Sequence, residues 1–438
     1  MAFWLHLARA KHPDRIAVEG PERSLTYAEL SDAAASAAGA LEQMGAGSRV
    51  ALALPAGEEF VIALHGCLLA GIAAVPIDLR LSEQERELRQ AGAEVVVTEP
   101  LGGSQTTMPR SFAGDPVVAV MHTSGTTAAP KPVELTHSNF QASALGSAVA
   151  LGLDPAERWL CPMPLSHVGG LSILIRSAIY ATTTVLHGRF DTEAVLNELM
   201  DPGRRSTMVS LVPTMLSRLL DAGLERPPTL RWALLGGGPI PPGLLERAAD
   251  AGVPVAPTYG MTEACSQIAT FGWPLQGVEV EPAADGEILV RGPIVSSGAI
   301  AEDGWLHTGD LGGFDERGRL QITGRKADTI VTGGENVAPV EVESVLLEHP
   351  AVRDAGVFGR PDPEWGEALV AVVVLRDGLT ADATELLRFC RERLAPFKVP
   401  KAVEFAAQLP RTGSGKLLRR QLESLRMIGD SGIRQTAR

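Results

Sequence analysis

Two hydrophobic patterns alternate along the first two thirds of the chain. Short apolar runs typical of buried strands are RVALALP, AEVVVTE, TTTVLH, TMVSLVP, RWALLGGG and VPVAPTYG. Between them lie stretches with helical periodicity, such as TYAELSDAAASAAGALEQMG, DTEAVLNELM and PTMLSRLLDAG. Strands that alternate with helices form parallel sheets covered by helices, so the pattern predicts an α/β fold.

The pattern changes near Trp273. From there to Gly324 the chain has short strand-like runs between Gly, Pro and Asp turns, which predicts a small antiparallel or barrel-like subdomain. A compact α+β tail of roughly 110 residues follows. We therefore expect an N-terminal domain over residues 1–324, with the subdomain at about 273–324, and a C-terminal domain over residues 325–438.

The longest apolar run, Phe60–Leu79, is interrupted by His65, two glycines and Pro76. A membrane-spanning helix needs a longer uninterrupted apolar stretch. The run therefore predicts a buried helix followed by a strand, and no membrane partner is expected.

Composition and charge narrow the class of partner. The 438 residues are 45% hydrophobic and 21% charged, which is typical of a soluble globular protein. A formal net charge of −13 argues against nonspecific nucleic-acid binding, so we expect a small-molecule partner. The N-terminus lacks the apolar run of a secretory signal, and we expect a cytoplasmic protein.

The four cysteines are far apart and form no C-x-x-C pair. Neither a zinc site nor a disulfide framework is suggested by that spacing. We expect reduced thiols in the core at Cys67, Cys161, Cys265 and Cys390.

A run of small polar residues, Thr123–Lys131, carries four hydroxyls, one glycine and one lysine. It follows the strand-like DPVVAVMH and precedes VELTHSNFQASALGSAVALG, which predicts a helix capped near Thr136 or Ser138, so we expect a strand-to-helix loop. Such a loop offers N–H, hydroxyl and ammonium donors to a polyphosphate. A plain surface turn is the alternative, and a Walker A loop is excluded because its motif is absent.

Further polar groups follow strand-like runs. Gly236–Gly238 leave bare backbone against which a flat ring could lie. The stretch Thr258–Gln267 offers an aromatic ring, a hydroxyl and the Glu263 carboxylate, which could hold Mg²⁺ or simply begin a helix. Asp310 lies in a Gly-flanked turn, and Lys416 projects from a loop of small residues.

The order of these motifs resembles one family. TSGTTxxxK, LLGGG, YGMTE, TGD, GRKADTIVTGGEN and PRTGSGK resemble the adenylate-forming superfamily of acyl-CoA synthetases, adenylation domains and luciferases, over nearly the whole chain. The resemblance implies that a carboxylic acid is activated with ATP and Mg²⁺ to an acyl-adenylate, which the thiol of coenzyme A then attacks.

The resemblance also implies roles for individual residues. The β- and γ-phosphates would bind Lys131 and the loop residues Thr123, Ser124, Gly125, Thr126 and Thr127. Gly236, Gly237, Gly238 and Tyr259 would enclose adenine, with Thr262 on the α-phosphate and Glu263 on the metal. Asp310 and Arg325 would bind the ribose.

The resemblance further implies a mobile C-terminal lid. Lys416 would neutralise charge between the acyl oxygen and the α-phosphate in one lid position. In the other, Gly333 and Gly334 would form a wall of the pantetheine tunnel, where a side chain would block the thiol. Ala327 replaces the usual hinge residue.

Two segments indicate which carboxylic acid is the substrate. They are Pro162–Phe190 and the segment around Gly236–Gly238. They look most like the menaquinone-pathway branch of the family, which acts on 2-succinylbenzoate and must bind a second, unactivated carboxylate. Arg176, in a mostly apolar helix predicted to begin near Gly169, is the candidate cation. His167, Ser266 and Gln267 would complete the acid pocket, although Arg176 could instead reach the surface and His167 could be a core residue.

Other functions stay open at this point. A medium-chain or aryl acyl-CoA ligase is the nearest alternative. An amino-acid adenylation domain is less favoured, because no aspartate lies between Pro164 and Arg176 to meet an amino group. A non-catalytic nucleotide-binding relative is disfavoured by the presence of both Lys131 and Lys416. A homodimer is possible.

Overall fold

The computed structural model describes residues 4–90, 92–103, 114–123, 131–411 and 417–425. These residues divide into two compact units. The first comprises the described chain up to Gly237 together with Arg247–Val280 and Val290–His307. The second comprises Gly238–Glu246, Glu281–Leu289 and the described chain from Thr308 onward.

The larger sheet of the first unit confirms the predicted α/β class. It has nine strands in the order β14-β13-β12-β11-β10-β8-β9-β1-β2, and its central strands are parallel. The strands are β1 (Ile16–Glu19), β2 (Ser24–Thr26), β8 (Arg158–Cys161), β9 (Thr183–Leu186), β10 (Met208–Leu211), β11 (Trp232–Leu235), β12 (Val255–Met261), β13 (Ser266–Thr270) and β14 (Trp273–Pro274).

A second sheet in the same unit has the order β5-β3-β4-β6-β7. Its strands are β3 (Arg49–Leu52), β4 (Ala73–Pro76), β5 (Val95–Val97), β6 (Val117–Thr123) and β7 (Lys131–Thr136). β3 and β4 are joined by α3 (Glu58–Ala70), which is buried along nearly its whole length. The apolar run from Phe60 is therefore a core helix followed by a strand, as predicted, and no helix of the described residues could span a membrane.

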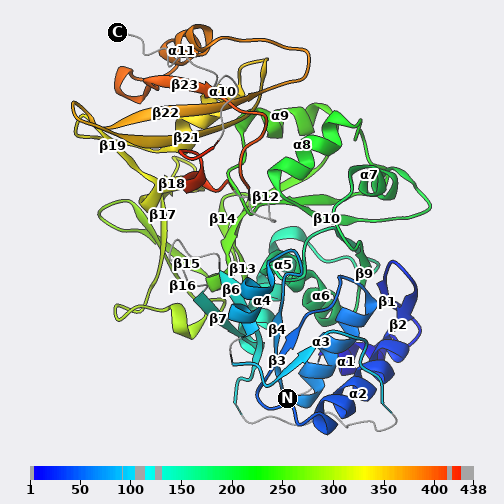
Figure 1. The fold of residues 1–438 in the computed structure, drawn as a ribbon. Helices are drawn as coiled ribbons and strands as arrows, with labels where there is room; N and C mark the ends of the chain where they lie inside the picture. The colour runs from blue at the N-terminus through cyan, green and yellow to red at the C-terminus, as the bar shows by residue number, and fades with distance from the viewer. Residues whose placement is uncertain (1–3, 91, 104–113, 124–130, 412–416, 426–438) are drawn as a thin grey trace. The chain divides into compact units, whose positions relative to one another are not determined.

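Helices cover these sheets (Figure 1). Up to residue 250 they are α1 (Trp4–Lys11), α2 (Tyr27–Gln43), α3, α4 (Glu83–Gln90), α5 (His137–Leu151), α6 (Val168–Tyr180), α7 (Thr192–Met200), α8 (Pro213–Asp221) and α9 (Pro242–Asp250). α5 begins at the predicted cap, since the Thr136 side chain accepts from the Asn139 N–H in a capping box. α5 and α6 lie side by side.

Smaller sheets follow along the chain. One has the order β15-β16-β17-β18, with β15 (Glu279–Pro282), β16 (Glu287–Arg291), β17 (Leu306–Phe314) and β18 (Leu320–Arg325). The other, in the second unit, contains β19 (Ile330–Thr332), β20 (Glu335–Val337), β21 (Val352–Asp362), β22 (Gly366–Leu375) and β23 (Ala402–Phe405). Helices α10 (Pro339–Leu347) and α11 (Ala383–Arg391) pack on this sheet around Val342, Leu346 and Leu386.

The structure corrects the prediction that a strand-to-helix loop holds the hydroxyl run. The residues after Thr123 lead into β7, which pairs antiparallel with β6 and places Lys131 opposite Thr123. Val133 and Leu135 are buried whereas Pro132 and Glu134 are exposed, a period of two that fits a strand and not the first turns of a helix. The run therefore connects two strands of a hairpin.

The four cysteines are free and buried, as predicted. The proposed domain boundary between residues 324 and 325 stays a prediction.

Candidate active site

The hydroxyl run is described only at its two ends. Thr123 and Lys131 face each other across the β6–β7 ladder, and the Thr123 hydroxyl lies 3.5 Å from the Lys131 carbonyl oxygen. Lys131 is exposed. Ser124, Gly125, Thr126 and Thr127 lie outside the described residues. The structure thus brings the first hydroxyl and the lysine of the predicted phosphate site together.

The glycine turn after β11 lies against β12. A Cβ on Gly236 would lie 2.7 Å from the Thr258 Cγ2 atom and 2.8 Å from its carbonyl oxygen, so only glycine allows this approach. Gly237 has φ +79. Tyr259 follows Thr258 in the adjacent parallel strand. Two of the predicted adenine-binding glycines therefore follow one strand directly, and the predicted aromatic ring lies in the neighbouring strand of the same sheet.

Thr262 and Glu263 lie in a short turn. β12 ends at Met261, and the 3-10 helix η1 (Thr262–Ala264) leads back into the antiparallel β13. A Cβ at Gly260 would lie 1.6 Å from the Ser266 carbonyl oxygen, so this hairpin closes only over glycine. The half-buried Glu263 carboxylate receives no hydrogen bond or ion pair from any described residue. It is therefore free to meet a cation.

Ser266 and Gln267 begin β13. Gln267 is buried, and its Nε2 donates to the Thr270 hydroxyl at 2.9 Å. Its Oε1 is buried without a partner among the described residues. Ser266 has φ +90, a left-handed conformation that is unusual for serine.

Arg176 is in the interior of α6 and does not reach the surface, since only 1% of it is exposed. Its Nη2 donates to the Ser143 hydroxyl at 2.9 Å, and its guanidinium carbon lies 5.9 Å from the centre of the Trp159 ring. Nε is buried without a partner, and no carboxylate of the described chain pairs with this guanidinium. Burial lowers the pKa of Arg176, although the group stays cationic at neutral pH.

His167 is the residue just before α6, which begins close to the predicted position, and its side chain makes no capping hydrogen bond. Its Nε2 lies 3.9 Å from an Asp78 carboxylate oxygen. Asp78 accepts bonds from the Arg80 guanidinium at 2.6 Å and 2.8 Å. Burial lowers the pKa of His167 although the Asp78 charge opposes it, so the imidazole is neutral at pH 7 and can accept or donate a hydrogen bond.

Within the second unit, Asp310 and Arg325 face each other across the β17–β18 ladder. The Arg325 Nε donates to the Asp310 Oδ1 at 2.7 Å, and Asp310 is 6% exposed. The two predicted ribose ligands are thus paired with each other.

The Gly333–Gly334 turn joins β19 and β20. Both glycines are left-handed, with φ +59 and +85. A Cβ on Gly333 would lie 3.0 Å from the Trp365 ring, whereas one on Gly334 would meet nothing within 4 Å. The Trp365 ring also lies 4.0 Å from the Lys401 Nζ. Lys416 lies outside the described residues.

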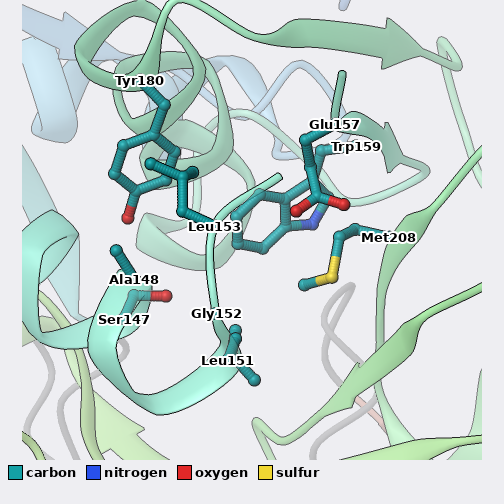
Figure 2. Close-up of a pocket in the computed structure, with 9 residues that line it drawn as sticks. All are labelled: Ser147, Ala148, Leu151, Gly152, Leu153, Glu157, Trp159, Tyr180 and Met208. Atoms are coloured by element: carbon teal, nitrogen blue, oxygen red, sulfur yellow. The ribbon is translucent and has the colours of Figure 1, made fainter. Parts of the chain in front are cut away.

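One small cavity lies near Arg176 but is too small for an acid. Its volume is about 10 Å³, room for roughly one water molecule. Figure 2 shows Glu157, Trp159 and Tyr180 among its lining residues. Figure 2 also includes Ser147, one turn beyond Ser143 on α5.

The family profile described as AMP-binding enzyme matches residues 5–111 and 98–299, and the AMP-binding enzyme C-terminal domain matches residues 341–416. The chain belongs to the AMP-binding enzyme family. Among curated members of this family, the 2-succinylbenzoate–CoA ligase of Bacillus licheniformis is 40% identical over 475 residues, which cover 96% of this chain and 98% of the relative.

Solved structures of AMP-binding enzymes are similar as well. The o-succinylbenzoate CoA synthetase from Bacillus subtilis, in complex with the acyl-adenylate intermediate OSB-AMP, has a TM-score of 0.89 and 37% identity, covering 98% of this chain and 99% of that one. Its complex with ATP and magnesium ion has a TM-score of 0.87 and 37% identity, covering 96% and 99%.

Sequence reasoning missed several neighbours of the predicted site residues in this AMP-binding enzyme. Ser143 and Trp159 contact Arg176, and Asp78 lies near His167. Asp78 and Arg80 occur together in a charged turn after an apolar strand, a signal that could have identified them. Ser143 is one of several small residues in α5 and carried no such signal.

Proposed function

We propose that this AMP-binding enzyme is an ATP-dependent acid–CoA ligase that converts 2-succinylbenzoate to 2-succinylbenzoyl-CoA in menaquinone biosynthesis. The choice of substrate is supported by one observation. Arg176 is a buried guanidinium that no carboxylate of the described chain neutralises. A buried cation is costly without an anion, and the unactivated carboxylate of 2-succinylbenzoate would supply one. The similarity to the Bacillus ligases supports the same substrate.

The reaction would proceed in two steps. In the first, a carboxylate oxygen of the acid attacks the α-phosphorus of ATP, the bond to the bridging oxygen breaks, and pyrophosphate leaves. In the second, the thiolate of coenzyme A attacks the acyl carbonyl and AMP leaves. Because both partners of the first step are anions, catalysis rests on positioning and on cations around the phosphates.

The chain offers donors for each part of ATP. Thr123 and Lys131 would bind the β- and γ-phosphates, together with Ser124–Thr127. Thr262 would contact the α-phosphate, and Lys416 would neutralise charge as the new bond forms. Gly236–Gly238 and Tyr259 would enclose adenine, and the Asp310–Arg325 pair would bind the ribose hydroxyls.

A magnesium ion would be bound by a single protein carboxylate in this site. Among the described residues no three His, Cys, Asp or Glu side chains form a ready-made metal cluster. Mg²⁺ at nucleotides is commonly held by one or two carboxylates plus phosphate oxygens and water. Glu263, which no described residue neutralises, would be that carboxylate, and the bound ion would offset the phosphate charge.

The thiol step would use Gly333 and Gly334 as a wall of the pantetheine tunnel. Gly334 has open space where a side chain would stand, so bare backbone is available to a passing thiol. Ser266, Gln267 and the neutral His167 would line the acid pocket. A cytoplasmic location and a possible homodimer stay part of the proposal.

A medium-chain or aryl acyl-CoA ligase is the second candidate. The apolar surroundings of α6 would also suit an acid with one carboxylate, but such an acid leaves Arg176 without an anion. Amino-acid adenylation and a non-catalytic nucleotide-binding role lack any observation in their favour.

The test is a panel of acids in a CoA-dependent AMP-release assay. We expect 2-succinylbenzoate to give the highest kcat/KM, above hexanoate, benzoate and the monocarboxylate analogue benzoylpropionate. Preference for a monocarboxylate would leave only a general acyl-CoA ligase, and absence of ATP–pyrophosphate exchange with any acid would favour the non-catalytic alternative.

A further inference from the structure

A single buried hydroxyl joins Arg176 to the turn that carries Thr262 and Glu263. The Ser143 Oγ on α5 accepts from the Arg176 Nη2 at 2.9 Å and donates to the Cys265 carbonyl oxygen at 2.8 Å. Guanidinium can only donate and a carbonyl can only accept, so both bonds have one possible polarity. Ser143 is 1% exposed, and water cannot easily replace either bond.

On the Cys265 side, the hydroxyl supports a backbone conformation that is otherwise costly. Cys265 ends η1 with φ +50, and its N–H donates to the Thr262 carbonyl at 3.0 Å. Ser266 follows with φ +90. Consecutive non-glycine residues in the left-handed region persist only when their surroundings hold them, and the Ser143 bond is one such support.

On the Arg176 side, the hydroxyl fixes the orientation of the guanidinium. Trp159 lies near the guanidinium, and its own ring is held by a bond from Nε1 to the Ser210 hydroxyl at 3.0 Å. With Nη2 held by Ser143, the guanidinium has little freedom to rotate about its long axis. Its remaining N–H groups are therefore set in direction before any acid arrives.

We propose that Ser143 is a positioning residue for acid recognition, which orients Arg176 toward the unactivated carboxylate and links it to the Thr262–Cys265 turn. This inference rests on the proposed function. Ser143 itself contacts neither the acid nor ATP in this proposal, so it acts through Arg176 and the turn.

Ser143→Ala tests the inference. We expect the KM for 2-succinylbenzoate in ATP–pyrophosphate exchange to rise about tenfold, the size expected when a hydrogen bond to a charged group is lost. The KM for ATP should rise by less than the KM for the acid, because Ser143 bonds Arg176 directly but reaches Thr262 and Glu263 only through the Cys265 carbonyl oxygen. Ser147→Ala is the matched control, because Ser147 is equally buried one turn later on α5, and the bonds to Arg176 and to the Cys265 carbonyl oxygen come from Ser143.

Conservative variants separate positioning from packing. Ser143→Thr keeps the hydroxyl and should keep the KM within about threefold of the native value. Ser143→Cys keeps the size and weakens both bonds, so its KM should lie between those of the native enzyme and Ser143→Ala; it carries the test if Ser143→Ala does not fold. A threonine variant as impaired as the alanine variant would overturn the proposal.

The second readout is specificity. With benzoylpropionate, or in an Arg176→Ala background, Ser143→Ala should add little further loss. An equal rise in KM for both acids, or a full additional loss without Arg176, means a structural role only and overturns the inference. A failure of the proposed function would be visible separately, in the native enzyme, as poor turnover of 2-succinylbenzoate, and it would remove this inference as well.

Discussion

Arg176 has the largest side chain among the fully buried residues of the described chain. Lysine could shed its proton in such a place, but a guanidinium keeps its charge, so the cost of burial stays until an anion arrives. Ser143 and Trp159 lower that cost in part, through one hydrogen bond and the face of an aromatic ring. These two contacts are its described polar and aromatic partners, and neither carries a negative charge.

Removing this guanidinium should therefore weaken the binding of 2-succinylbenzoate but not the binding of ATP. We expect Arg176→Ala to raise the KM for 2-succinylbenzoate by about thirtyfold or more, since a buried carboxylate without its partner costs roughly 2 to 5 kcal/mol. The KM for ATP should be nearly unchanged. Steady-state kinetics with both acids checks this, and an equal loss for 2-succinylbenzoate and benzoylpropionate would contradict it.

At the residue scale, the sequence predicted residues whose chemistry differs from that of their neighbours. One arginine inside the apolar stretch LSILIRSAIY has few structural explanations, and its burial agrees with the interpretation that it does not reach the surface. Ser143 could not be predicted, because its importance depends on two contacts with residues distant in the chain. A serine among alanines in a helix carries no local sign of such contacts.

At the element scale, the β6–β7 hairpin and the β19–β20 turn carry the predicted phosphate and thiol contacts. The hairpin was predicted as a loop before a helix because three alternating residues are too short to distinguish from a helix start. The turn was predicted from Gly333–Gly334, and the left-handed φ of both residues explains why glycine is required.

A side chain at Gly334 should separate the two half-reactions. We expect Gly334→Leu to leave pyrophosphate release within about twofold and to slow CoA ester formation at least tenfold, because the isobutyl group would enter the proposed tunnel. Pyrophosphate release is measured in a single turnover with ATP and acid alone, and CoA ester formation is measured after coenzyme A is added.

The control for this variant is Gly378→Leu. Gly378 is also left-handed, with φ +78, belongs to the same unit, and has no atom within 4 Å of a built Cβ. It therefore carries the same backbone strain without the proposed contact with pantetheine. If both variants lose CoA ester formation equally, strain and not obstruction is the cause.

At the scale of the whole molecule, local pattern predicted the fold class but not the strand order. Strand and helix alternate along the chain, so the sequence predicts parallel sheets. That Ile16–Glu19 pairs in parallel with Thr183–Leu186 depends on contacts across more than half of the first unit, and no local pattern encodes it. The pairing of Asp310 with Arg325, by contrast, lies within one hairpin of consecutive strands.

Buried and half-buried histidines should make the stability of the first unit depend on pH. Burial lowers the pKa of both His65 and His122 to about 4, and burial also lowers that of His137 and His187. Between that value and the ordinary pKa near 6.5, the unfolded chain binds protons that the folded chain does not. Stability should therefore fall as the pH drops from about 6.5 toward 4.

His65→Gln should make that decline shallower. One fully buried histidine with this shift accounts for on the order of 3 kcal/mol across the window. Urea denaturation at pH 7 and at pH 5 measures the difference, and His6→Gln, at an exposed position on α1, is the control that should leave it unchanged. A His65 variant with the native pH slope would contradict the assignment.

Trp365, which backs the Gly333–Gly334 turn, is the only tryptophan of the second unit, since the other five belong to the first. Its indole is partly exposed and lies beside the Lys401 ammonium, so its emission depends on the polarity and charge around that turn. Replacing the other five with phenylalanine would leave an intrinsic fluorophore at the proposed thiol path. The binding of coenzyme A at this turn could then be followed by tryptophan fluorescence, without a label and separately from the reaction on ATP.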